Sequence, residues 1–198
     1  MLGNVEVLEF RFLDVKDEAD INTYSDEYAW SRPYEYNLAS KFLDNQLKVG
    51  SSIHNSAWGF EGVHIDFRNT LDKKYRCTHS DIVKNKYNLE TYYYNLFNRD
   101  PKLIENFDCV LNISVLEHLP GGFNSTEMVL ENLLEQAKVG GLLLCTFDYP
   151  IVNLKKLESL LGCKCIDAEN RLSGANSVVK NNTYENLNIV FLALRRLS

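Results

Sequence analysis

Short apolar runs alternate with amphipathic segments along the chain. Patterns typical of buried strands occur at 47–53, 107–113, 142–147 and 188–194. Weaker strand patterns occur at 5–13, 75–80, 91–94 and 163–166.

Apolar residues at helical spacing predict four helices between these strands, at 33–46, 62–75, 125–138 and 154–161. Pro33 suits the first turn of the first helix, and Ser125 or Thr126 is suited to cap the third. Gly140 and Gly162 follow the third and fourth patterns as stop signals.

Strands that alternate with helices predict an α/β fold, with a doubly wound, mostly parallel sheet and helices on both faces. The last two strands differ, because no helical pattern separates residues 166 and 189. The segment between them allows an antiparallel return. A length of 198 residues fits a single domain, which we expect at 33–198. The mixed pattern of residues 1–32 predicts a loosely attached N-terminal cover segment.

The segment 47–81 reads as a strand, a turn with two glycines, a helix and a second strand that ends in an acid. Gly59 and Gly62 place small residues where the backbone swings from strand to helix and a ligand can approach closely. Asp81 follows Gly59 by 22 residues, and a carboxylate there can accept hydrogen bonds from both hydroxyls of a ribose. An ordinary strand-to-helix connection fits this segment equally well.

The charge of the chain narrows the classes of partner. A net charge of −6 and a pI of 5.3 disfavour a protein that grips nucleic acid by its phosphates. No apolar run approaches the length that spans a bilayer, and no secretory leader pattern opens the sequence, so we expect a cytoplasmic protein without a membrane partner.

The five cysteines form no disulfide framework, and we expect reduced thiols. Cys163 and Cys165 resemble half of a metal site but have no second pair and no nearby histidine. The four histidines lack the spacing of a helical zinc motif, so the sequence predicts no metal.

Two segments carry a family resemblance. The first, FDCVLNISVLEHL at 107–119, matches the pattern FDxVxxxxVLEH, and the second, AKVGGLLLCTFDYP at 137–150, has two glycines where Val139 replaces the proline of a common "PGG" segment. With the order of the elements, these segments resemble the class I (Rossmann-like) S-adenosylmethionine-dependent methyltransferases, from about Tyr34 onward.

The resemblance implies a seven-stranded sheet whose last strand, 188–194, lies antiparallel beside 142–147, with S-adenosylmethionine as the cofactor at the carboxyl ends of the strands. The turn would hold the methionine part, Asp81 the ribose, and Ile82 and Asn95 the adenine. The full set of implied cofactor residues is His54, Asn55, Ser56, Trp58, Gly59, Glu61, Gly62, Asp81, Ile82, Asn95, Asn112 and Ile113.

The first motif departs from the family. The family carries an acid late in its first strand, followed by G-x-G, whereas residues 52–56 here read SIHNS. No carboxylate stands there for the ammonium group of the methionine, although Asn55, Glu61 or backbone carbonyls can substitute.

The resemblance implies methyl transfer, which asks the protein mainly for positioning and exclusion of water. His118 follows a strand end and is the candidate general base, because histidine exchanges protons near physiological pH. A structural role for His118 fits equally well. Tyr149, Arg32 and Tyr34 are candidate substrate-binding residues, and the acceptor is expected to be a small molecule or a saccharide.

The sequence is also compatible with two other functions. The altered first motif also fits a catalytically silent cofactor-binding or scaffold protein with the same fold. A nicotinamide-dependent enzyme is disfavoured by the missing G-x-G-x-x-G and by the VLEH segment.

Overall fold

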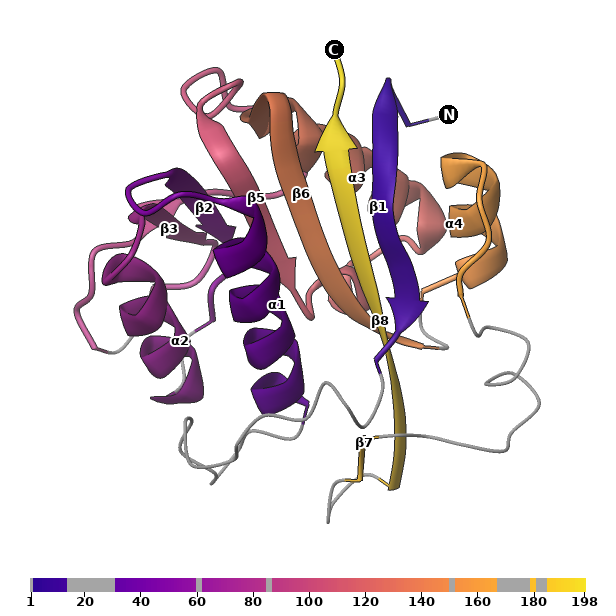
Figure 1. Ribbon diagram of the computed structural model, residues 1–198, viewed down its shortest axis with the longest axis horizontal. Coiled ribbons are helices and arrows are strands. Elements are labelled where there is room, and N and C mark those ends of the chain that lie inside the picture. Colours follow the sequence, from indigo (N-terminus) through magenta and orange to yellow (C-terminus); the bar gives the residue numbers. More distant parts are fainter. Residues whose placement is uncertain are drawn as a thin grey trace.

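A computed structural model describes residues 2–13, 31–59, 62–84, 87–149, 152–166, 179–180 and 185–198. Seven strands lie side by side in the order β1-β8-β6-β5-β2-β3-β4 (Figure 1). Their bounds are Val5–Phe12 (β1), Ser52–Ser56 (β2), Arg76–Asp81 (β3), Tyr92–Tyr93 (β4), Phe107–Ile113 (β5), Ala137–Tyr149 (β6) and Glu185–Arg196 (β8). The short β7, Val179–Lys180, pairs with β8 off this path.

Strands β6, β5, β2, β3 and β4 are parallel to one another, while β8 runs antiparallel to both β6 and β1. Leu143 of β6 lies opposite Leu194 of β8, as expected for the predicted return of the last strand. The predicted fold class, a mostly parallel seven-stranded sheet with an antiparallel last strand, is confirmed.

Helices cover both faces of the sheet because its central strands are apolar on both faces. Helices α1 (Arg32–Gln46) and α2 (Gly62–Asp72) pack on one face through side chains such as Leu43 and Phe67. Helices α3 (Phe123–Gln136) and α4 (Leu154–Leu161) pack on the other through Leu130 and Leu157. Figure 1 shows α1 and α2 in front of the sheet and α3 behind it. None of the helices among the described residues is both long and apolar enough to cross a bilayer.

Strand β1 corrects one expectation for the N-terminal segment. It is not loosely attached: its pairing with β8 runs from Val5 opposite Arg196 to Phe12 opposite Val190, and Phe10 and Phe12 are buried in the core. Residues 14–30 lie outside the described residues. The division into a cover segment at 1–32 and a domain at 33–198 stays a prediction, but β1 belongs to the sheet.

The first core strand is shifted from its predicted position of 47–53. Val49 is exposed, and Gly50 has a φ of 85° in a turn, so β2 begins only at Ser52. This strand contains His54, Asn55 and Ser56, whose polar side chains interrupt the apolar pattern that predicts a buried strand.

Other boundaries also differ from those that the sequence predicts. Helix α3 begins at Phe123 after Gly122, before the predicted caps Ser125 and Thr126. The glycines after it do not end an element, because β6 already begins at Ala137 and runs through them. The predicted strand at 163–166 reduces to one bridge between Ile166 and Arg11.

Candidate functional site

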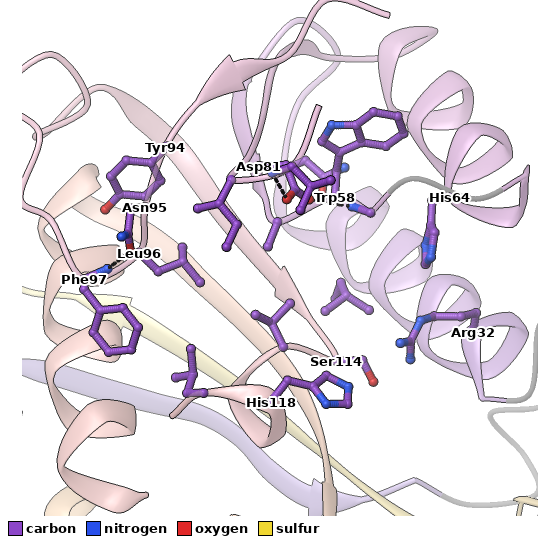
Figure 2. A pocket seen from close by; sticks show the side chains of 18 of the residues that line it. Arg32, Trp58, His64, Asp81, Tyr94, Asn95, Leu96, Phe97, Ser114 and His118 are labelled. Atoms are coloured by element: carbon purple, nitrogen blue, oxygen red, sulfur yellow. Dashed lines mark hydrogen bonds between the residues drawn. The ribbon is translucent and has the colours of Figure 1, made fainter. Parts of the chain in front are cut away.

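A pocket of about 530 Å³ opens at the carboxyl ends of β2, β3 and β5 (Figure 2). Parallel strands bring their carboxyl ends to one edge of a sheet, and ligands of open α/β sheets bind there. The volume is within the range of small-molecule sites. Nine residues that the sequence analysis selected line this pocket: Arg32, Asn55, Trp58, Gly59, Asp81, Ile82, Asn95, Ile113 and His118.

Asp81 is the last residue of β3 and fixes two turns of the pocket wall. Its Oδ2 accepts a hydrogen bond from the backbone N–H of Gly59 at 3.1 Å, and its Oδ1 accepts one from the N–H of Val83 at 2.9 Å. Each carboxylate oxygen has a further lone pair. Asp81 can therefore hold the two turns and still accept hydrogen bonds from a ligand.

Tyr36 and His64 also line the pocket, and of the two only His64 is not indicated by the sequence. The Tyr36 hydroxyl is hydrogen-bonded to His64 Nδ1, and the Tyr36 ring stacks on Phe67 with 4.0 Å between centroids. His64 packs so closely on Gly59 that a Cβ there would lie 2.5 Å from its Cδ2. Gly59 is therefore required both by this contact and by its φ of 88°.

One end of the pocket wall carries the positive charge of Arg32, which forms an ion pair with Glu35, a buried residue outside the wall. Arg32 Nη1 lies 2.7 Å from Glu35 Oε2, and the fully buried Glu35 also accepts hydrogen bonds from Ser31 and Thr146. Burial alone would raise the pKa of Glu35, but the Arg32 guanidinium and these hydrogen bonds bring it below its usual value. Burial, and then the charge of Arg32, lower the pKa of His64 to about 4. The Arg32–Glu35 ion pair therefore places a charged guanidinium beside a neutral His64.

Figure 2 shows how the pocket divides. Arg32 and His64 lie at one end in this view, Asn95 and Phe97 at the other, and Asp81 between them. His118 is the last residue of the 3₁₀ turn Leu116–His118, and its side chain is exposed. The pocket therefore has a cationic end, a central carboxylate and an end lined by an amide and apolar groups.

Several predicted site residues lie outside this pocket wall. His54 is buried beneath it, with Nδ1 2.5 Å from Gln136 Oε1 and Nε2 2.7 Å from Ser80 Oγ. Ser56 and Asn112 are buried and hydrogen-bonded to each other at 3.1 Å. These three residues connect strands in the core, so we leave them out of the proposed site.

The predicted substrate residues Tyr34 and Tyr149 also lie away from the pocket wall. Tyr34, a residue of α1, is buried in the core, and the Tyr149 ring packs edge-on against Phe12 with 5.8 Å between centroids. Gly62 is the first residue of α2, and Glu61 lies outside the described residues. Of the three predicted substrate residues, Arg32 alone lines the pocket.

Glu117 is a buried acid of the VLEH segment, close to the pocket but not in its wall. It is 8% exposed, and within the described part of the chain neither carboxylate oxygen has a hydrogen-bond partner. Burial, reinforced by the nearby Glu35 and Asp148, raises its pKa from 4.5 to about 7. The ionised form of Glu117 is therefore costly in the folded chain.

We expect Glu117→Gln to raise the free energy of unfolding above pH 7 by about 3 kcal/mol, because the glutamine cannot ionise. Below pH 4.5 the proton of Glu117 stabilises the fold fully, and this contribution is lost as the pH rises towards 7. Urea unfolding across this range should show the effect, with the exposed Glu131→Gln as control. If Glu117→Gln has the same free energy of unfolding as wild type at every pH, the pKa of Glu117 is not raised in the folded chain.

No protein-family model and no curated protein sequence matches the chain, so the comparisons rest on solved structures. A Burkholderia thailandensis 1,6-didemethyltoxoflavin-N1-methyltransferase with bound S-adenosylhomocysteine is 15% identical, with a TM-score of 0.59, over 90% of this chain and 85% of that one. The N-methyltransferase NodS from Bradyrhizobium japonicum is 13% identical, with a TM-score of 0.54, over 87% and 90%. The chain has the fold of the class I S-adenosylmethionine-dependent methyltransferases.

The methyltransferase fold explains why the pocket lies where β2, β3 and β5 end, but it does not fix the reaction. The cyclase SpnF is as similar as the two methyltransferases, with 12% identity and a TM-score of 0.57 over 88% of this chain and 87% of that one. At such identities the comparisons show the fold alone. The function has to be argued from the residues of the pocket.

Proposed function

We propose that the chain binds S-adenosylmethionine in this pocket and transfers the methyl group to a small-molecule or saccharide acceptor. The observation that carries the proposal is the Asp81 carboxylate at the end of β3. The backbone N–H groups of Gly59 and Val83 hold this carboxylate in place, and each of its oxygens keeps a lone pair that can accept a hydrogen bond from a ligand. A ribose diol offers two donors at the spacing of such a carboxylate.

The two ends of the pocket suit the two ends of this cofactor. Asn95 can exchange hydrogen bonds with an adenine edge, beside the apolar side chains of Ile82 and Leu96. Arg32 can pair with the carboxylate of the methionine part, and His64 can donate a further hydrogen bond to it. Among the described residues of the wall Asp81 is the only acid, so the ammonium group depends on Asn55 or on backbone carbonyls.

When bound, S-adenosylmethionine supplies an electrophilic methyl group on a sulfonium. The chain itself has to align the acceptor and keep water away. Apolar residues of the wall, among them Val115 and Leu119, serve the second task. His118, exposed in the same wall, is placed to take a proton from an acceptor hydroxyl or amine.

The test is calorimetric titration with S-adenosylmethionine and S-adenosylhomocysteine. We expect Asp81→Ala to weaken binding by about 1.5–3 kcal/mol, or about 10- to 150-fold, because charge-assisted hydrogen bonds to the ribose are lost. Asp81→Asn should lose less, since its amide keeps one acceptor oxygen. The exposed acid Asp44, on α1, provides the control Asp44→Ala.

Two results would overturn the cofactor assignment. One is a wild-type chain that gives neither heat nor a thermal shift with millimolar ligand. The other is an Asp81→Ala variant that binds as tightly as wild type, which would place the site elsewhere.

The second candidate function is a catalytically silent cofactor-binding protein. It is favoured by the sequence SIHNS at 52–56, which lacks the acid of the first motif. Tight cofactor binding without methyl transfer to any component of a cell extract would support this function over the enzyme.

A further inference from the structure

Three metal-ligand side chains meet at the junction of α2 and β3, outside the pocket wall. Asp72 ends α2, while Cys77 and His79 lie two residues apart on β3 and so face the same side of the sheet. One oxygen, sulfur or nitrogen atom from each lies within 4.8 Å of the other two. His79 Nε2 lies 2.9 Å from Asp72 Oδ1.

We propose that Asp72, Cys77 and His79 form a binding site for a zinc ion. Thiolate, imidazole and carboxylate are the three ligand types that zinc takes in proteins, and three protein ligands leave a fourth position for water. Ligand atoms around a tetrahedral zinc lie roughly 3 to 4 Å apart. The three side chains are thus already close to the required geometry.

The site is open to the solvent from which an ion would arrive. The Asp72 side chain is 43% exposed, Cys77 is half-buried and His79 is buried. Binding of zinc would replace the Cys77 thiol proton, which leaves to solvent, and would move the His79 proton from Nε2 to Nδ1. One carboxylate and one thiolate balance the charge of the ion.

Neighbouring side chains can orient the ligands. Asn55 Nδ2 lies 3.2 Å from His79 Nδ1, and the same amide, turned over, presents its oxygen to a proton on Nδ1, as the outer partner of a metal-bound histidine does. Arg68 is the nearest cation, with Nε 3.8 Å from Asp72 Oδ2. Its guanidinium lies over the Trp58 ring, 4.9 Å from the centroid, so it is held by a second group as well.

The site would adjoin the cofactor pocket, because Asn55 and Trp58, which both contact His79, also line that pocket. The inference does not rest on the proposed function. The sequence does not reveal the site, because four residues lie between Asp72 and Cys77 and one between Cys77 and His79, and this spacing matches none of the zinc motifs considered above.

The test is titration of the chelator-treated protein with Co²⁺, followed by absorbance. We expect one bound ion per chain, with visible bands of a four-coordinate site and a near-ultraviolet thiolate-to-metal band. Cys77→Ser should abolish the thiolate band, and Cys163→Ser, at a half-buried thiol elsewhere, should keep it. Asp72→Asn changes an exposed side chain and should weaken Co²⁺ binding at least about tenfold.

Zinc should also raise the thermal unfolding midpoint of wild type and of Cys163→Ser, and should raise that of Asp72→Asn clearly less at the same zinc concentration. This measurement decides the matter even if Cys77→Ser does not fold. The proposal is overturned if wild type shows no thiolate band with excess Co²⁺, if the band survives in Cys77→Ser, or if Asp72→Asn binds Co²⁺ as tightly as wild type.

Discussion

Replacing Arg32 by alanine should lower the free energy of unfolding at neutral pH by about 3–5 kcal/mol, because it leaves a buried carboxylate without its counter-charge. Glu35 is fully buried, and Arg32 is the cation that holds its pKa down. The hydrogen bonds from Ser31 and Thr146 stay in place, but they do not neutralise the charge. The loss should shrink as the pH falls and the Glu35 of the variant takes up a proton.

The measurement is equilibrium unfolding in urea, and two further variants serve as controls. Lys74→Ala breaks the exposed ion pair with Asp44 and should cost less than about 1 kcal/mol. Adding Glu35→Gln to Arg32→Ala removes the orphaned charge and should recover much of the stability. A loss in Arg32→Ala no larger than that in Lys74→Ala would show that the buried pair does not stabilise the fold.

His118→Ala should lower the rate of methyl transfer by about 10²- to 10⁴-fold if His118 is the general base. The side chain lines the pocket and is exposed, so its removal should leave the fold and the affinity for S-adenosylmethionine almost unchanged. The measurement is turnover with an acceptor found in a small-molecule or extract screen, together with calorimetry on the same variant. An unaltered rate would assign His118 a structural role, and Glu131→Gln serves as the distant control.

Apolar patterns predicted β5 and α4 with their observed bounds and β8 in part. They misplaced β2, because its side chains are buried as hydrogen-bonded polar groups, and His54 reaches Gln136 across 82 residues of sequence. A pattern of hydrophobicity carries no information about such a pairing. The position of β1 beside β8 was likewise missed, since nothing local in 5–13 specifies which strand it joins.

The part of the site that could be predicted comes from strand ends. Asp81 and Ile113 end β3 and β5, and parallel strands bring such ends to one edge. His64 was missed because its contact with Tyr36 joins two helices. Tyr36 follows Arg32 by four residues, so both face the same side of α1.

The place of β8 between β1 and β6 affects how the protein can fold during synthesis. Val5 pairs with Arg196, so β1 finds this partner only after the residues up to β8 have been made. Until then β1 and β6 each have an open edge that β8 later covers. Contacts so distant in sequence slow folding, and exposed strand edges favour association with other chains. A nascent chain that lacks residues 185–198 should therefore depend on chaperones.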